Sequence, residues 1–366
     1  MQIAIVGGSL GGLFAAALLG RAGHKIQLFE RSRSGLEGRG AGLLAQRDIF
    51  AILRAVGCEH VAHVGVVAKE HIVLDRSGMV IERHATPQMQ ISWDYLYRRF
   101  RELLDEGSYH TGRTVTAVGH DRDSAWLTLA DGSRIEADLV IGADGIGSVV
   151  RAAVTGSSAP PSYAGYVAWR GLFPETDLPP HAAELLLDRF AFYRAPRSHI
   201  LGYVVAGPRG EMLPSERRYN WVWYSPEPDL DKVLIDRTGR RQSFSLAPGM
   251  VRESARLEML ARAQAVLPGV FLDALRAAPT PFVQAIFDYE TPGMASGRLA
   301  LLGDAAFVAR PHSAMGVAKA AADSMALVAA LADMSLRPAL ELYERERMSR
   351  NQAIVAQGRR LGRSLQ

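Results

Sequence analysis

Residues 3–30 read IAIVGGSLGGLFAAALLGRAGHKIQLFE, and this stretch decides the fold. The apolar run 3–6 has strand character and passes directly into a glycine-rich turn. The alanine- and leucine-rich segment 13–22 predicts a helix, and 25–29 predicts a second buried strand that stops at Glu30. A strand, a glycine turn, a helix and a second strand form the context in which the dinucleotide-binding fingerprint works.

Each residue of the turn has a physical reason in this interpretation. Gly7 makes the tight turn, and Gly12 lets the helix pack close to the strand. The free N–H groups of the first helical turn offer the positive end of the helix dipole to a pyrophosphate. Ser9 stands where a glycine is usual, but it is small and its hydroxyl can donate to phosphate. Glu30 is placed to reach a ribose hydroxyl. An ordinary strand and helix of an α/β domain is the alternative, and the whole combination favours nucleotide binding over it.

Composition limits the class of protein. The chain has 366 residues, 48% of them hydrophobic, enough for one large domain with an insert or for two domains. The net charge is +4, and basic residues alternate with acidic ones, so we expect a solvated surface and no nucleic-acid partner. The single cysteine, Cys58, excludes an intramolecular disulfide and a cysteine-based metal cluster. The apolar start lacks a basic region, and no segment has the length of a membrane span, so we expect a cytoplasmic protein without a membrane partner.

Two further regions complete the predicted architecture. Residues 156–292 are rich in proline and aromatic residues, and their strand-like runs 164–171, 199–206 and 219–224 predict an antiparallel sheet that carries a substrate pocket. Residues 64–83 alternate like a hairpin that turns at Ser77-Gly78. Buried strands return at 139–141 and 298–302, followed by an apolar helix over 316–332 and a polar helix over 338–363, which we expect to lie across the outside. The predicted fold is α/β: a discontinuous Rossmann-like FAD-binding domain (1–63, 92–155, 293–366) with an inserted, mainly antiparallel substrate domain (64–91, 156–292).

Two later motifs place an aspartate at the end of a buried strand. Residues 138–151 read DLVIGADGIGSVVR, and residues 298–306 read RLALLGDAA, followed by RPHSAMG at 310–316. Asp144 and Asp304 therefore follow the carboxyl ends of their strands, where ligands of open α/β sheets bind. Asp-Gly and Gly-Asp also occur in simple turns. Three such strand ends at one sheet edge favour a binding site, and without a histidine cluster neither aspartate is expected to bind a metal.

With these three motifs in this order, the sequence resembles the FAD-dependent aromatic hydroxylases, the single-component flavoprotein monooxygenases. The stretch YAGYVAWRG at 163–171 and the RPHSA segment extend the resemblance to a subgroup. Many members carry an arginine where this chain has Trp93. The resemblance implies that the pyrophosphate lies at the first turn, the adenosine ribose at Glu30, and the isoalloxazine against residues 311–316. The implied cofactor-binding residues are Gly7, Ser9, Leu10, Gly12, Glu30, Arg31, Val115, Asp144, Gly145, Gly303, Asp304, Pro311, Gly316 and Val317.

The resemblance also implies the reaction. NADH or NADPH would reduce a non-covalent FAD, oxygen would form a flavin C4a-hydroperoxide, and a small hydroxylated aromatic would be hydroxylated, a hydroxypyridine such as 2,6-dihydroxypyridine. A larger phenolic or polyketide-type substrate is an alternative, as is a nucleotide-binding protein without redox turnover. The partners expected are the small aromatic substrate and molecular oxygen, and the sequence leaves a homodimer open.

Four residues are candidates for the chemistry: Tyr203, His312, Gln46 and His199. Tyr203 and His199 lie four residues apart in one predicted strand, so they share a face and can both point into the pocket. A packed or outward-facing His199 is the simpler interpretation. His312 could bond the substrate or relay a proton, or it could bond backbone at a helix start. Gln46 follows the glycine-rich loop. Trp169, Trp221 and Trp223 are expected to pack within the sheet.

Overall fold

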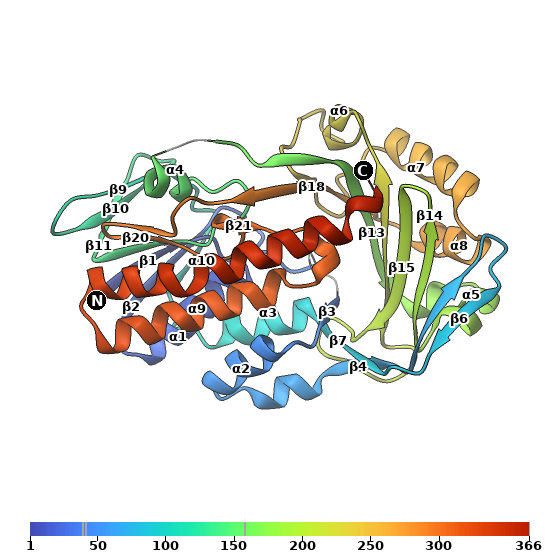
Figure 1. The fold of residues 1–366 in the computed structure, drawn as a ribbon, viewed down its shortest axis with the longest axis horizontal. Coiled ribbons are helices and arrows are strands. Elements are labelled where there is room, and N and C mark those ends of the chain that lie inside the picture. Colours follow the sequence, from blue (N-terminus) through green and yellow to red (C-terminus); the bar gives the residue numbers. More distant parts are fainter. Residues whose placement is uncertain (39, 41, 157–158, 366) are drawn as a thin grey trace.

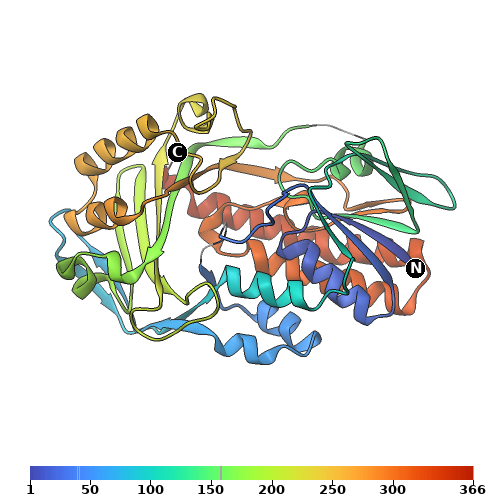
Figure 2. The same cartoon turned by 180° about the vertical axis from the view of Figure 1, so that it is seen from behind.

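The computed structural model describes residues 1–38, 40, 42–156 and 159–365. The chain forms two parts that lie side by side, one built on a mainly parallel sheet and the other on a large, mostly antiparallel sheet (Figures 1 and 2). Helix α10 and strand β18 run along both parts and join them (Figure 1).

The parallel sheet positions the predicted motifs. Its strand order is β19-β20-β12-β1-β2-β8, and all neighbours except β19 and β20 pair in parallel. Val6 at the end of β1 lies opposite both Gly142 of β12 and Phe29 of β2, and Gly142 lies opposite Leu301 of β20, so the carboxyl ends of these strands are level. The predicted convergence of the three strand ends at one edge is therefore confirmed. The strands are β1 (Gln2–Val6), β2 (Lys25–Glu30), β8 (Tyr109–Thr111), β12 (Leu139–Gly142), β19 (Ala295–Ser296) and β20 (Leu299–Leu301).

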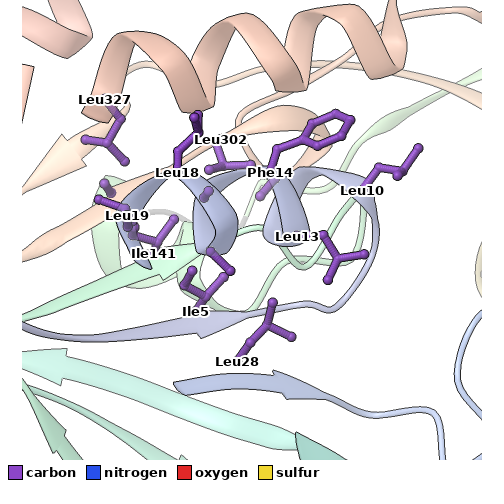
Figure 3. Packing of buried hydrophobic residues seen from close by; sticks show 14 of the residues in the cluster. Ile5, Leu10, Leu13, Phe14, Leu18, Leu19, Leu28, Ile141, Leu302 and Leu327 are labelled. Atoms are coloured by element: carbon purple, nitrogen blue, oxygen red, sulfur yellow. The ribbon is translucent and has the colours of Figure 1, made fainter. Parts of the chain in front are cut away.

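Helices cover one face of this sheet. Helix α1 lies between the sheet and α9, and Leu13, Phe14 and Leu19 are fully buried there (Figure 3). A helix with apolar contacts on two sides needs apolar residues almost all round, which explains its alanine- and leucine-rich sequence. The other face is covered by α4 and by an antiparallel three-stranded sheet. These elements are α1 (Leu10–Arg21), α2 (Arg47–Ala55), α3 (Trp93–Glu102), α9 (Gly316–Asp333), α10 (Leu336–Leu361), α4 (Val150–Thr155), β9 (Val115–His120), β10 (Ala125–Leu129) and β11 (Arg134–Ala137).

The large sheet has the order β17-β18-β13-β16-β15-β14-β5-β6, with β21 paired to β18. Its outer face packs on helices α5, α7 and α8 and holds Trp169, Trp221 and Trp223, each at most 1% exposed, so their predicted packing is confirmed. The elements are β5 (Glu70–Leu74), β6 (Val80–His84), β13 (Ser162–Pro174), β14 (Arg189–Ala195), β15 (Ser198–Val205), β16 (Arg218–Pro226), β17 (Ser245–Leu246), β18 (Phe282–Glu290), β21 (Phe307–Val308), α5 (Pro180–Leu186), α6 (Leu230–Leu234), α7 (Glu253–Val266) and α8 (Gly269–Ala277).

Strands β5 and β6 form the hairpin expected over residues 64–83. A smaller sheet, β3-β7-β4, lies between the two parts, and the end of the glycine-rich loop forms its strand β3. Strand β3 passes close to β15: a Cβ on Gly42 would lie 2.4 Å from the Tyr203 ring, so only glycine fits. The remaining elements are β3 (Gly42–Leu44), β4 (Gly65–Ala68), β7 (Gln88–Ser92) and the 3-10 turns η1 (Glu59–His63), η2 (Glu175–Asp177), η3 (Gly303–Ala305), η4 (Pro311–Ser313) and η5 (Arg363–Leu365).

The polar helix α10 is more than an outer cover. Its outward residues are exposed, but Tyr343, Arg347 and Asn351 are buried against α9 and the sheet. At its end, η5 turns onto the inner face of the large sheet, where Leu365 is 1% exposed beside Tyr166. The end of the chain therefore contributes to the space between the two parts (Figure 1).

Candidate functional site

A cavity of about 1270 Å³ extends from the edge of the parallel sheet to the inner face of the large sheet. Residues at the ends of four neighbouring strands line it: Gly303 and Asp304 after β20, Asp144 after β12, Gly7 after β1, and Glu30 at the end of β2. Because typical ligand pockets measure about 300–1,000 Å³, this cavity has room for a large cofactor together with a small second ligand.

The first turn of α1 suits an anion at one end of the cavity. Gly7 has a φ of +105°, which favours glycine, and a Cβ on Gly12 would lie 1.9 Å from the carbonyl oxygen of Gly7. Within the described residues, no side chain caps the start of α1 and no acidic residue lies in its first turn. The amides of the first turn of α1 are thus open to a phosphate, as a bound dinucleotide requires.

Glu30 is held in position beside this turn. It is 5% exposed, and its carboxylate accepts hydrogen bonds from the backbone N–H of Gly8 at 2.9 Å and of Ser32 at 2.7 Å. The Tyr109 hydroxyl donates to the carbonyl of Gly8 at 3.1 Å. Arg31 is exposed and lines the cavity next to Glu30.

Arg151 connects the motif at residues 138–151 (the middle motif) with the motif at residues 298–306 (the late motif). Asp144 accepts hydrogen bonds from the Ser148 hydroxyl at 2.5 Å and from the amide of Val149 at 2.7 Å, which fixes the turn that leads into α4. Arg151, 5% exposed, donates to the carbonyl oxygens of Asp304 at 2.9 Å and of Ala305 at 2.7 Å. The ends of β12 and β20 therefore form one rigid unit.

Two buried charged side chains of helix α9 contact Gly303 and Asp304 of the late motif. The carboxylate of Asp323, fully buried, accepts from the amide of Gly303 at 3.0 Å and from Arg347 Nε at 2.7 Å. Lys319, also fully buried, places Nζ 3.5 Å from the half-exposed carboxylate of Asp304. These contacts fix the backbone at Gly303 and place the Asp304 side chain at the cavity.

The turn before α9 provides a second helix N-terminus at the cavity. Arg310 forms a bidentate ion pair with Asp288 of β18, with distances of 3.0 and 2.7 Å, and so fixes the start of the turn. Among the described residues, no side chain caps α9 and none in its first turn is acidic. Gly316 and Val317 line the cavity, so the positive end of an 18-residue helix faces it. This arrangement suits the electron-rich ring of a reduced flavin, and with the turn at α1 it fits FAD.

The inner face of the large sheet forms the other wall, which we call the chamber wall. Residues opposite one another in the ladders share a face, so the register defines rows across the sheet. One row contains Arg194, His199, Tyr224, Ala168 and Gln284. The next row contains Phe192, Leu201, Val222, Arg170 and Phe282. All these residues except Ala168 and Phe282 line the cavity.

Imidazole and phenol groups gather where the chamber wall meets the turn before α9. His312 Nε2 lies 2.8 Å from the Tyr166 hydroxyl, with which it shares a hydrogen bond. The His312 ring also lies 4.3 Å from the ring of Tyr224 and 5.4 Å from that of His199. Burial lowers the pKa of His199 to about 4 and of His312 to about 3. Both imidazoles are therefore neutral at neutral pH, and each offers one hydrogen-bond donor and one acceptor.

Tyr203 lies farther along the chamber wall and is 7% exposed. Its hydroxyl donates to the carbonyl of Gly42 at 3.1 Å, and its ring stacks on Phe190 at 4.7 Å. Burial raises the pKa of Tyr203 to about 12, so it is a neutral phenol. In the present structure this residue connects the chamber wall to β3.

The structure brings almost all the predicted site residues to one cavity. The exceptions are Gly12, which packs behind Gly7, and Gln46, whose Nε2 donates to the carbonyl of Ala314 at 3.3 Å and so supports the turn before α9. Trp93, where an arginine is common, lines the cavity, stacks on Tyr97 at 5.0 Å and packs over Gly40. Residues that the sequence did not single out also line the cavity: Arg113, Gln90, Arg170, Phe190, Phe192, Tyr224, Gln284, Leu302 and Ser364.

The described ranges contain no group of three or more histidine, cysteine or acidic side chains that could hold a metal ion. None of their helices combines the length and apolar character that a bilayer crossing requires.

Comparison with known proteins gives consistent results. Residues 163–288 match a family described as FAD binding domain-like, and residues 288–358 match one described as FAD binding domain. The 2,6-dihydroxypyridine 3-monooxygenase of Paenarthrobacter nicotinovorans is 30% identical over 100% of this chain and 91% of its own length. The 6-hydroxynicotinate 3-monooxygenase of Bordetella bronchiseptica is 27% identical over 95% and 88%. The solved structure of 2,6-dihydroxypyridine-3-hydroxylase from Arthrobacter nicotinovorans superposes with a TM-score of 0.92 at 29% identity, covering 100% of this chain and 92% of that one.

Proposed function

The chain belongs to the family of FAD-dependent aromatic hydroxylases, and from this premise we propose that it hydroxylates a small hydroxypyridine at the expense of NAD(P)H. The observation that carries the proposal is the cavity itself. Four strand ends and two open helix N-termini form one end, and neutral imidazole, phenol and aromatic side chains form the other. An anionic dinucleotide fits the first end, and a flat polar ring fits the second.

The reaction balances as one ring C–H, one O₂, one NAD(P)H and one proton giving ring C–OH, NAD(P)⁺ and water. FAD, when bound, supplies the redox chemistry, accepting the electrons of the nicotinamide and activating oxygen. The chain's own groups bind, orient and exclude water. In this proposal the amides of α1 hold the pyrophosphate, Glu30 the ribose, and the start of α9 the flavin ring.

The chamber wall would orient the substrate and manage its proton. A ring oxygen that has lost its proton donates more electron density to the ring than a hydroxyl does, so the site gains by holding the substrate ionised. His312, hydrogen-bonded to Tyr166, and the adjacent His199 are neutral, so each can donate one hydrogen bond and accept another at its ring nitrogens and so orient the substrate. The rings of Phe190 and Phe192 keep water from the reacting centre.

The relatives favour a hydroxypyridine over other rings, since two of them carry that substrate class in their names. A larger phenolic or polyketide-type substrate would have to share about 1270 Å³ with the whole of FAD. The space therefore favours a single small ring. A nucleotide-binding protein without redox turnover would not need the buried imidazole pair beside the helix N-terminus.

The test uses the purified protein and its Asp304→Ala variant. The wild type should be yellow and should oxidise NAD(P)H with a matching amount of product for one member of a panel of 2,6-dihydroxypyridine, 2-hydroxypyridine, 6-hydroxynicotinate and 3-hydroxybenzoate. Asp304→Ala should be colourless, and Asp333→Ala, at the exposed end of α9, serves as the matched control. A protein that stays colourless after addition of FAD contradicts the proposal. Oxidation without product for every ring contradicts the substrate class.

We further propose that the protein works in the cytoplasm, which the free thiol of the buried Cys58 supports. The homodimer stays a prediction, and the sequence leaves the choice between NADH and NADPH open. Sedimentation of the FAD-loaded protein and the ratio of kcat/KM for the two nicotinamides test them.

A further inference from the structure

The charges of the chamber wall are all of one sign. The large sheet contributes two arginines to the lining of the cavity, Arg170 from β13 and Arg194 from β14. Among the described residues that this sheet contributes to the cavity there is no carboxylate. The carboxylates that line the cavity, Glu30, Asp144 and Asp304, belong to the ends of the parallel strands at the cofactor end.

Arg170 occupies the inner position of the two. It lies opposite Val222 on β16, one row away from Tyr224, and is half-buried. Its Nε is buried, and no hydrogen-bond acceptor for it occurs in the part of the chain that the structure describes. The described ion pairs likewise do not include Arg170. Arg194 is exposed at the edge of the cavity, beside His199 and with its guanidinium 5.8 Å from the ring of Phe192.

The groups around Arg170 are neutral. Its guanidinium is hydrogen-bonded to the phenol of Tyr224 and lies near that of Tyr203. Burial raises the pKa of each phenol to about 12, and the guanidinium opposes this rise. The two imidazoles of the same cavity, His199 and His312, have pKa values lowered by burial to about 4 and about 3. At neutral pH the two guanidiniums are thus the charges on this side of the cavity.

A guanidinium is protonated at every accessible pH, and a partly buried one that is hydrogen-bonded only to a neutral phenol lacks the anionic partner that would compensate its desolvation. An anionic ligand in the cavity would offset it. The planar, fork-shaped donors of a guanidinium also match an oxygen attached to a flat ring better than the point charge of a lysine ammonium does. The guanidiniums of the chamber wall therefore have no counter-ion among its described residues until a ligand with a negatively charged oxygen binds.

We propose that Arg170 is the substrate-binding residue that holds the ring oxygen of the substrate as its anion. The inference rests on the proposed function and deepens it: the substrate class becomes hydroxyaromatics that bind in the deprotonated form. The O–H bond breaks on binding, the proton passes to solvent, and the electron pair stays on oxygen, where it activates the ring. Arg194 adds attraction at the entrance and makes no direct contact with that oxygen.

The test measures the ionisation of a bound probe in the FAD-loaded protein. The probe is 4-nitrophenol, whose phenolate has its own visible absorption, and 4-nitroaniline serves as a neutral probe of the same shape. Titrations at a series of pH values give the dissociation constant and the pKa of bound 4-nitrophenol for the wild type, Arg170→Gln and Arg170→Lys. Arg337→Gln, an exposed arginine at the start of α10, is the matched control.

In the wild type the pKa of bound 4-nitrophenol should fall below that of the free probe. Arg170→Gln should remove this shift and weaken phenolate binding roughly 30-fold or more, as for loss of one partner of a desolvated charge pair. Binding of 4-nitroaniline should change little, Arg170→Lys should restore part of the shift, and Arg337→Gln should behave as the wild type. A steric role would weaken both probes alike.

Three results separate the outcomes. An unchanged pKa of the bound probe in Arg170→Gln overturns the inference and leaves the proposed function standing. A wild-type protein that takes FAD but binds neither probe, and converts no ring of the panel, overturns the proposed function. If Arg170→Gln fails to fold, the wild-type titration decides alone, because a bound pKa at or above that of the free probe refutes an anion site.

Discussion

Gly12→Ala is the sharpest test of how the α1 turn is built. The added Cβ would lie 1.9 Å from the carbonyl oxygen of Gly7, whereas ordinary contacts of this kind are 3.4 Å or longer. Helix α1 or the turn must therefore shift by about 1.5 Å, the difference between these two distances. The atom in the way is backbone, so no side-chain rotation relieves the clash.

The shift has two measurable consequences. Overpacking of this kind costs about 1–3 kcal/mol of folding free energy. A shift of that size also takes the amides of the first turn out of hydrogen-bonding range of a phosphate placed for the native turn. Since a hydrogen bond to a charged group contributes about 1.5–3 kcal/mol, loss of a single one should weaken FAD binding roughly 10-fold to 100-fold.

Gly20→Ala in the same helix is the matched control. Gly20 is exposed, and no described atom lies within 4 Å of the Cβ that alanine would add. Alanine inside a helix is favoured over glycine by about 0.5–1 kcal/mol, so this variant should be slightly more stable than the wild type. Titration of apoprotein with FAD, followed by flavin fluorescence, and thermal unfolding measure both effects. If Gly12→Ala binds FAD as tightly as Gly20→Ala and unfolds at the same temperature, the close packing of α1 on the turn is not what the site depends on.

Three further outcomes are expected. Asp323→Asn should destabilise the apoprotein by about 3–5 kcal/mol, because it leaves the buried guanidinium of Arg347 without its charge partner and weakens the hydrogen bond to the amide of Gly303. An unchanged urea midpoint would contradict this. The pKa values of His199 and His312 are about 4 and about 3, against an ordinary 6.5, so below pH 6.5 the unfolded chain binds more protons than the folded one. The free energy of unfolding should therefore fall as the pH falls from 6.5 towards 3. Thermal unfolding should show a weaker pH dependence in the double variant His199→Gln, His312→Gln. Tyr203→Phe should keep its flavin, lose about 0.5–1.5 kcal/mol with the hydrogen bond to β3, and hydroxylate more slowly in single turnovers; a rate equal to that of the wild type would remove this residue from the candidates.

The parallel sheet was predictable because its signals are local. A strand of apolar residues that ends in a glycine turn can be recognised without knowledge of its neighbours, and parallel strands place their carboxyl ends at one edge. The strand β12 and the helix α9 were therefore expected within one or two residues of where they lie. The family predicted from these motifs is confirmed, as is the α/β fold with its antiparallel sheet regions.

The supports of the site were not predictable, since they depend on contacts between distant segments. Arg151 could be recognised as part of a motif, but its bonds to the backbone at Asp304 and Ala305 require the pairing of β12 with β20. Asp323 stands in an apolar helix, and a buried charge there was the available signal of a structural role. The contact of Gln46 with the carbonyl oxygen of Ala314, in the turn before α9, likewise joins segments far apart in the sequence.

The large sheet shows why the chamber side was the hardest part to derive. Alternation along β16 separates Trp221 and Trp223 from Val222 and Tyr224, but the sequence does not say which set faces the cavity. The answer depends on α7 and α8, which cover the tryptophan face and leave the other face to the cavity. A register shift of one residue in β13 would exchange Arg170 for Trp169, placing a tryptophan in the chamber and a guanidinium in the apolar core. Packing of the tryptophans on the outer face therefore fixes the register of β13, and this register places Arg170 on the inner face. Stability of the sheet and the proposed recognition of the substrate thus depend on the same ladder of hydrogen bonds.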